Sequence, residues 1–134
     1  MKNKSYDTYR RIWLKLSEYI DISARTSISD LELASINAFH SVFPEVEINC
    51  CFFHFIQCIW RSIQREGLTT QYGNNEILQK HLKILSGLAF VDPEEVTRYY
   101  ELLEDKTHEV GLSTILRPVL DYMEHNCIGR FIRN

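Results

Sequence analysis

Residues 46–63, VEINCCFFHFIQCIWRSI, change from one hydrophobic period to another within a single stretch. Apolar residues alternate with polar ones from Val46 to Cys50, which is typical of a half-buried strand. From Phe52 onward the large apolar side chains recur every three or four residues, as they do on one face of a helix. The stretch therefore predicts a strand that runs directly into a helix, and Gly67 is the expected end of that helix.

The residues before this stretch predict the same kinds of element. We expect an amphipathic helix at about residues 5–20, a strand with period-two alternation at residues 22–28, and a helix at residues 29–42 that Pro44 ends. Two strands joined through a helix are most simply parallel neighbours with a right-handed crossover. The first strand is nevertheless poor in Val, Ile and Leu for a buried parallel strand.

After this point every periodic segment is helical. Helices are expected at residues 77–89, 93–107 and 114–127, and a polar turn is expected at residues 72–75. The fold class is therefore predicted to be α/β and mostly helical.

Two prolines bear on the ends of these helices. The segment from Asp92 to Glu95 combines a side-chain cap, Pro93 at the first helical position and a glutamate that reaches back, which together indicate a helix start. Pro118 either kinks the last helix or marks its true beginning.

Composition limits the classes of protein that the chain can represent. With 134 residues, 45% of them hydrophobic, it is long enough for one compact domain or slightly more. The longest nearly apolar run, Cys50 to Trp60, is about half of the roughly 20 residues that a membrane-spanning helix needs, so no membrane span is expected. The N-terminus has no apolar secretion signal, which predicts a nuclear or cytoplasmic protein with free or metal-bound thiols. The net charge of −3 argues mildly against a surface that binds nucleic acid.

Three side chains suited to metal chemistry fall at the predicted strand ends. Asp30 follows the first strand, and Cys51 and His54 follow the second. The carboxyl ends of parallel strands share one edge of the sheet, where open α/β folds usually place their sites. A carboxylate suits Mg²⁺ or Mn²⁺, whereas a thiolate with an imidazole suits zinc.

Simpler interpretations of these residues remain open. Ser29 and Glu32 have the spacing of a capping box, in which Asp30 only helps a helix to begin. Cys51 and His54 are half of a zinc site, and the alternative for them is a buried thiol and a hydrogen-bonded core histidine. Four residues are candidates for the missing ligands, although none has ligand spacing to another: His81, His108, His125 and Cys127.

Six stretches carry a family resemblance in unbroken order. They are YRRIWLKL at 9–16, SDLELASINAFHSVFP at 29–44, CCFFHFIQCIWRSIQREGL at 50–68, TTQY at 69–72, LSGLAFVDPEEV at 85–96 and LDYMEHNCIGR at 120–130. Together they resemble the transposase domain of Mutator-like elements (MULE). The similar features are a strand-ending Asp before an alanine-rich helix, a Cys-x-x-His mark before an aromatic and basic helix, and an aromatic-Glu-x-x-x-Ile-Gly exit.

The resemblance implies an RNase H-like fold with an Asp-Asp-Glu catalytic set that binds Mg²⁺ or Mn²⁺. Asp30 matches the second Asp of that set, and Cys51 with His54 matches the Cys-x-x-His signature, with zinc as a further option. Residues 1–68 would be the C-terminal part of the core, and residues 69–134 an all-helical insertion before the Glu.

The same resemblance predicts that the chain alone is inactive. Cleavage and rejoining of DNA by two metal ions needs more than one carboxylate. The first Asp and the Glu of the family are expected before Met1 and after Asn134, and Asp121 and Glu124 are expected to belong to the insertion. We therefore expect a fragment of a Mutator-like transposase without strand-transfer activity of its own.

The resemblance and the composition also bear on DNA binding and self-association. DNA is implied for the parent transposase, but weak or no DNA binding is expected here because the basic residues are few: Arg61, Arg65, Arg130 and Arg133. A two-stranded sheet with exposed edges and uncovered apolar faces predicts poor solubility or self-association. The alternative functions are a stand-alone helical protein-interaction module without catalysis, in which Asp30 is only a cap, and a zinc-stabilised helical domain.

Overall fold

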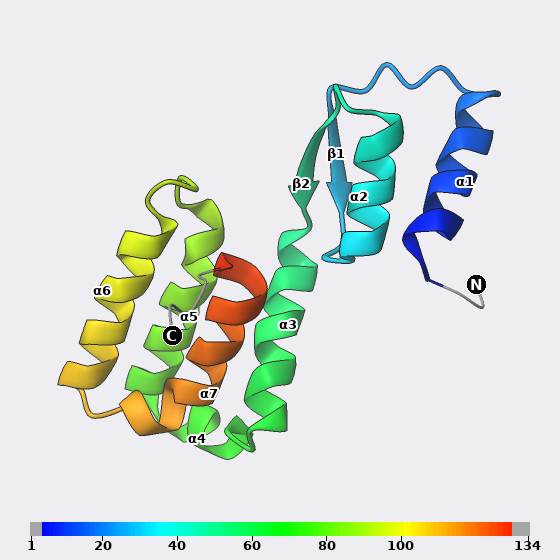
Figure 1. Ribbon diagram of the computed structural model, residues 1–134. Helices are drawn as coiled ribbons and strands as arrows, with labels where there is room; N and C mark the ends of the chain where they lie inside the picture. Colours follow the sequence, from blue (N-terminus) through cyan, green and yellow to red (C-terminus); the bar gives the residue numbers. More distant parts are fainter. Residues whose placement is uncertain (1–3, 130–134) are drawn as a thin grey trace, which may run out of the picture. The chain divides into compact units, whose positions relative to one another are not determined.

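The computed structural model describes residues 4–129, which are mostly helical and include one two-stranded sheet (Figure 1). The chain divides into two compact units, residues 1–55 and residues 56–134, which we call the first and second unit. Helix α3 (Phe52–Arg65) begins at the end of the first unit and continues into the second. The boundary after residue 68, which was expected to separate a core from a helical insertion, stays a prediction.

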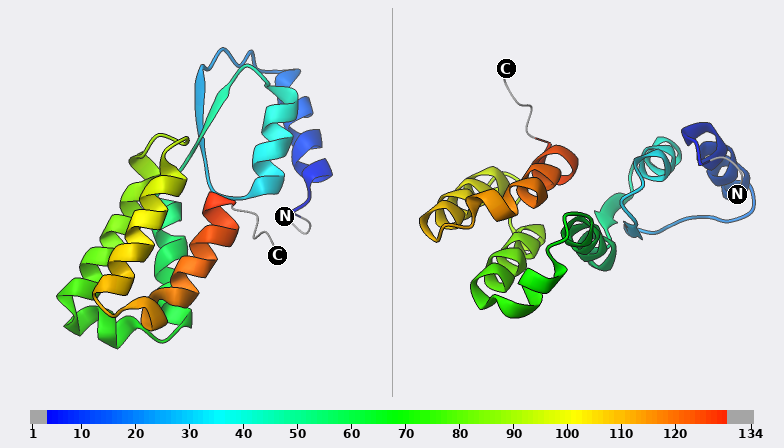
Figure 2. Two further views of the ribbon diagram at one scale, coloured as in Figure 1. Left: turned by 60° about the vertical axis from the view of Figure 1, so that its left-hand side comes forward. Right: turned by 90° about the horizontal axis from the view of Figure 1, so that it is seen from below.

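The first unit follows the predicted order of elements. It contains α1 (Tyr6–Ser17), β1 (Thr26–Ser29), α2 (Leu33–Val42) and β2 (Glu47–Cys50). The two strands pair in parallel, as predicted, with Thr26 opposite Glu47 and Ser29 opposite Cys50. In Figures 1 and 2, α2 lies beside the strands and α1 lies on the far side of α2.

Aromatic side chains hold α1 against α2. The Trp13 ring meets the Phe39 ring edge-on at 5.0 Å and the Phe43 ring at 6.4 Å, measured between ring centroids. The Tyr9 hydroxyl adds a hydrogen bond of 2.9 Å to Glu32 at the start of α2. No residue of α1 is fully buried, so the helix packs on α2 at the surface of the unit.

The predicted boundaries of β1 and α2 are wrong. The strand expected over residues 22–28 is confined to β1, and the helix expected from Ser29 begins at Leu33. Ser29 cannot cap α2 because it is the last residue of β1 and pairs with Cys50. Glu32 occupies the N-cap position without a side-chain hydrogen bond to the helix, so the capping box is also wrong.

The sheet face away from the helices differs from the apolar face that we expected. Thr26, Ile28, Glu47 and Asn49 are all exposed, and the register places them on one face. Ile28, which is 78% exposed, is the apolar member of this group. The uncovered face is therefore largely polar.

The second unit is all-helical over its described residues. After α3 it contains α4 (Thr69–Asn74), α5 (Glu76–Gly87), the 3₁₀ turn η1 (Leu88–Phe90), α6 (Val96–Glu109), α7 (Ser113–Met123) and the π-helical turn η2 (Glu124–Ile128). Of the sixteen buried apolar side chains among residues 4–129, all except Ala38 and Val46 belong to this unit. No helix in this described part of the chain is long and apolar enough to cross a membrane.

Gly67 ends α3 as predicted. Its φ of +68° lies in the left-handed region that favours glycine. The Leu68 N–H donates to the Ile63 carbonyl at 3.0 Å, and the Gly67 N–H donates to the Gln64 carbonyl at 3.1 Å. This pair of hydrogen bonds is the Schellman motif, which satisfies carbonyls at a helix C-terminus.

The polar turn predicted at residues 72–75 is wrong, because α4 covers most of it. Asn75 separates α4 from α5, and its side chain accepts a hydrogen bond of 3.0 Å from the Leu78 N–H. The polar residues that indicated a turn therefore include the N-cap of the next helix.

The predicted start of α6 is also wrong. The Glu95 N–H donates to the Asp92 carbonyl at 2.8 Å, which closes a turn, and the helix begins only at Val96. Pro118 lies inside α7, five residues after the first residue, Ser113. It therefore does not mark the beginning of that helix.

Candidate functional site

The structure brings Asp30 and Cys51 to the same edge of the sheet. Ser29 pairs with Cys50 in the parallel register, and the Cys51 N–H donates to the Ser29 carbonyl at 2.6 Å. Asp30 and Cys51 are the next residues along each strand. Both therefore lie at the carboxyl edge of the sheet, where the sequence places them.

The Asp30 side chain is exposed and takes part in a local turn. Its Oδ1 accepts a hydrogen bond of 3.3 Å from the Glu32 N–H, two residues further on. This is an Asx turn that leads into α2 rather than a cap on the helix. One carboxylate oxygen thus orders the loop while the group stays open to solvent.

Glu32 is directed toward α1. Its two carboxylate oxygens lie 2.9 Å from the Tyr9 hydroxyl and 3.2 Å from Lys4 Nζ. These partners precede it by 23 and 28 residues, so no local pattern in the sequence indicates the contact. Glu32 therefore ties α1 to the loop that carries Asp30.

Cys51 and His54 share the first turn of α3. The Cys51 carbonyl accepts a hydrogen bond of 3.1 Å from the Phe55 N–H, which makes Cys51 the N-cap position and His54 the third helical residue. These are the two positions of a capping box, in which each side chain accepts a hydrogen bond from the backbone N–H of the other residue. Cys51 is half-buried and His54 is exposed, so the interpretation of His54 as a core histidine is wrong.

The four candidates for further zinc ligands all belong to the second unit. His81 is buried, with Nδ1 2.8 Å from the Ile77 carbonyl oxygen, and His125 is exposed, with Nδ1 2.8 Å from the Asp121 carbonyl oxygen. Across residues 4–129, no three His, Cys, Asp or Glu residues are arranged to hold a metal ion. The proposed Mg²⁺, Mn²⁺ and zinc sites stay predictions.

The basic residues that the sequence offers to DNA have mixed surroundings. The Arg65 guanidinium lies 5.4 Å from the centre of the Tyr122 ring, and burial raises the pKa of Tyr122 to about 12. Arg61 is exposed. Arg130 and Arg133 lie outside the described residues.

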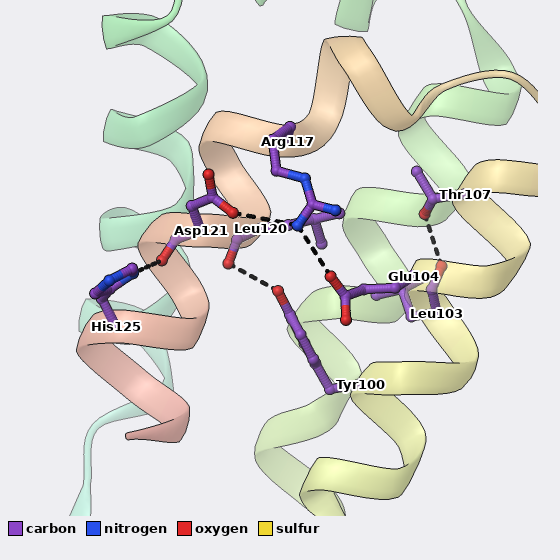
Figure 3. A network of polar contacts seen from close by, with 8 residues as sticks. All are labelled: Tyr100, Leu103, Glu104, Thr107, Arg117, Leu120, Asp121 and His125. Carbon is purple, nitrogen blue, oxygen red and sulfur yellow. Dashed lines mark hydrogen bonds and ion pairs between the residues drawn. The ribbon is translucent and has the colours of Figure 1, made fainter. Parts of the chain in front are cut away.

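A polar network connects α6 to α7 in the second unit (Figure 3). Arg117 Nη1 lies 3.2 Å from Glu104 Oε1 and 3.3 Å from Asp121 Oδ1, and the Tyr100 hydroxyl donates to the Leu120 carbonyl at 3.0 Å. The spacing of four between Arg117 and Asp121 is the part of this network that the sequence indicates. Asp121 thus has a structural partner within the helical unit.

Comparison with known families covers the first part of the chain. Residues 1–58 match the family model of the MULE transposase domain, and the match includes Asp30, Cys51 and His54. The similar stretches at residues 69–72, 85–96 and 120–130 lie beyond the match, so their assignment to the family stays a prediction. No curated protein and no solved structure matches the chain, and the RNase H-like fold likewise stays a prediction. The match over residues 1–58, which are less than half of the chain, supports a fragment of a MULE transposase domain in this part of the protein.

Proposed function

We propose that residues 1–68 derive from the core of a metal-dependent enzyme that cleaves DNA strands and transfers them, with an RNase H-like fold. Asp30 supplies one of its metal-binding carboxylates. The position of Asp30 carries this proposal: it is exposed, follows β1 directly and lies at the carboxyl edge within the matched segment. Open α/β sheets usually place their sites at this edge.

The chemistry explains why Asp30 alone is insufficient. In an in-line displacement at phosphorus, two metal ions about 3.5–4 Å apart stabilise the attacking and the leaving oxygen. Mg²⁺ and Mn²⁺ prefer oxygen ligands, and Asp30 offers one carboxylate. The nearby carboxylate of Glu32 is bound to Tyr9 and Lys4 instead. By this proposal the isolated chain does not cleave DNA, and residues 69–134 serve as the helical insertion of the parent.

Cys51 and His54 have a separate role in the proposal. They sit together on the first turn of α3, and a thiolate with an imidazole is a ligand set that suits zinc rather than magnesium. We assign them to the signature of the family, with zinc as the ion that they would bind. DNA as the partner of the parent, with the nucleus as its place of action, belongs to the same proposal.

Titration with Mn²⁺ tests the role of Asp30 in the chain itself. Bound Mn²⁺ should broaden the amide NMR signals of residues close to Asp30, and Asp30→Asn should abolish this local broadening. Asp21→Asn is the matched control, because it removes the same charge from an exposed position before β1. Broadening that is the same in wild type and Asp30→Asn would refute metal binding by Asp30.

Cleavage must be tested in a longer transposase that contains this segment. There Asp30→Asn should abolish DNA cleavage and leave the melting temperature nearly unchanged, whereas Asp21→Asn should retain activity. If the Asp30→Asn protein still cleaved DNA, Asp30 would not belong to the catalytic set.

A protein-interaction module is the second candidate function, and a hollow in the second unit favours it. The hollow has a volume of about 210 Å³ and is lined mainly by apolar side chains, including Trp60 and Tyr72, whose rings lie 5.3 Å apart. In this case Asp30→Ala would cost only the hydrogen bond of the turn, about 1 kcal/mol or less. The Mn²⁺ titration separates the two functions, because a module predicts no response that depends on Asp30.

A further inference from the structure

The hollow in the surface of the second unit has room for one large side chain. Its volume is about 210 Å³, and residues of α3, α4 and α5 line it. Pockets for small molecules usually measure about 300–1,000 Å³, whereas an apolar cavity of about 150 Å³ already binds benzene. The hollow therefore fits the apolar side chain of a partner protein better than a complete small-molecule ligand.

Aliphatic and aromatic residues make up most of the lining. Ile59, Ile63 and Leu82 are buried, and the rings of Trp60 and Tyr72 lie 5.3 Å apart. Trp and Tyr are among the residues that most often anchor protein–protein contacts. Trp60 is exposed in spite of its size, so part of its surface is open to a partner.

Lysine side chains add positive charge at this hollow. Lys83 belongs to the lining, is exposed, and makes no side-chain hydrogen bond or ion pair among residues 4–129. Lys80, one turn earlier on α5, is equally unpaired there, and it lines a second hollow together with Lys83 and Glu76. The two lysines outnumber this carboxylate, and the long flexible stem of a lysine lets its charge reach a nearby group. A carboxylate next to the apolar side chain of the occupant would therefore be attracted.

Helix α6 presents such a pair of side chains. Leu102 is 48% exposed, and Asp105 lies three residues later on the same side of the helix. Asp105 is exposed and makes no side-chain hydrogen bond or ion pair in the described part of the chain. The next residue, Lys106, is paired with Glu109 at 2.6 Å. An apolar side chain and an unpaired carboxylate therefore lie next to each other on α6.

We propose that the second unit binds a second copy of this chain, with Leu102 of one copy in the hollow of the other and Asp105 beside Lys83. The described lining comes from α3, α4 and α5, so the α6 that occupies the hollow belongs to another chain. A helix that meets a hollow is a heterologous contact, which can repeat from copy to copy in a ring or an open chain. The inference rests on the second candidate function, because it names the occupant of the same hollow, and it does not involve Asp30.

The contact should be weak. One apolar side chain and one exposed ion pair are much less than a standard interface of about 1,600 Å². Reversing one of the two charges replaces attraction by repulsion and should weaken the association roughly two- to thirtyfold.

Sedimentation equilibrium of the whole chain measures this association directly. The average mass of the wild type should rise with protein concentration, and it should rise less at high salt. Lys83→Glu and Asp105→Lys should each reduce the rise. An equal mixture of the two variants should restore it, because Asp105 of one variant meets Lys83 of the other. Asp92→Lys is the matched control, since it makes the same charge change at an exposed residue before α6 and should behave as the wild type does.

Three results would overturn the inference. They are a wild-type chain that stays monomeric at every concentration, an association that neither charge reversal weakens, and a mixture that stays as dissociated as its components. Leu102→Gln repeats the test without a change of charge and should weaken the association as well. None of these measurements depends on Asp30, so their failure is separate from a failure of the proposed metal site.

Discussion

Replacing Tyr100 with Phe tests the packing of the second unit, because the effect should reverse with pH. Tyr100 is 0% exposed, and its hydroxyl donates to the Leu120 carbonyl at 3.0 Å. A hydrogen bond of this kind contributes about 1 kcal/mol net. The Leu120 carbonyl also accepts from the Glu124 N–H, so the substitution leaves no unpaired acceptor. At neutral pH, Tyr100→Phe should therefore lower the free energy of unfolding by about 1 kcal/mol.

The sign of the effect changes in alkaline solution. Burial raises the pKa of Tyr100 well above the ordinary value for tyrosine. Above about pH 10 the unfolded chain releases the phenol proton while the folded protein keeps it, so stability falls by about 1.4 kcal/mol per pH unit until the raised pKa is reached. Phenylalanine has no such proton. The deficit of about 1 kcal/mol should thus vanish within about one pH unit above 10 and then reverse.

Urea unfolding followed by far-UV circular dichroism at several pH values from 7 to 11 measures this crossing. Tyr99→Phe is the matched control, because Tyr99 is 45% exposed and its substitution should change the free energy of unfolding by less than about 0.5 kcal/mol. If the deficit of Tyr100→Phe stayed constant across the whole range, Tyr100 would not be held protonated by burial, and the packing of α6 on α7 would be refuted.

Three further perturbations address the other parts of the chain. If Cys51 and His54 bind zinc, a chelator should lower the melting temperature, and Cys51→Ser should remove this response. A melting temperature that the chelator does not change would exclude the zinc site. Gly67→Ala should lower the free energy of unfolding by about 1 kcal/mol because φ is +68°, whereas Gly87→Ala, where an added Cβ meets nothing within 4 Å, should raise it by about 0.5–1 kcal/mol. Equal effects of the two substitutions in a urea melt would contradict the end assigned to α3. Leu116→Ala should cost about 2–5 kcal/mol in the same assay because Leu116 is 1% exposed, and a cost under 1 kcal/mol would show that this core position is loose.

The strongest periodic patterns in the sequence predicted their own helices and strands correctly. Alternation from Val46 to Cys50 gave β2, the helical spacing from Phe52 gave α3, and the helix between the two strands implied their parallel pairing. These elements are specified by which face each residue buries, and that information is local. The position of Asp30 at the carboxyl edge followed from the pairing alone.

The helix starts were misplaced where backbone groups form hydrogen bonds that the residue types do not indicate. Ser29 looked like a helix cap, but pairing with Cys50 keeps it in the sheet. Asp92 and Glu95 have the residue types of a helix start, yet a hydrogen bond between their backbones closes a turn before α6 begins. In both cases the residue types typical of a helix start are present, but the backbone forms a different hydrogen bond. A pattern of residue types does not reveal that bond.

Long-range contacts could not be predicted in the same way. The bonds of Glu32 to Tyr9 and Lys4 join residues more than twenty positions apart, and the contact of Trp13 with Phe39 joins α1 to α2. Such features need the packed arrangement of several elements. The sequence showed only that the first strand was poor in Val, Ile and Leu.

The distribution of buried side chains bears on the proposal that Asp30 alone is insufficient for catalysis. Metal-dependent catalysis requires carboxylates held close to their productive geometry by a well-packed surround. Asp30, however, lies on an exposed loop of the first unit, where Ala38 and Val46 are the buried apolar residues, while the other fourteen belong to the helical second unit. Two parallel strands of four residues each are marginal without further strands or covering helices. More of the parent domain would therefore have to contribute packing as well as ligands before Asp30 could hold a metal ion rigidly.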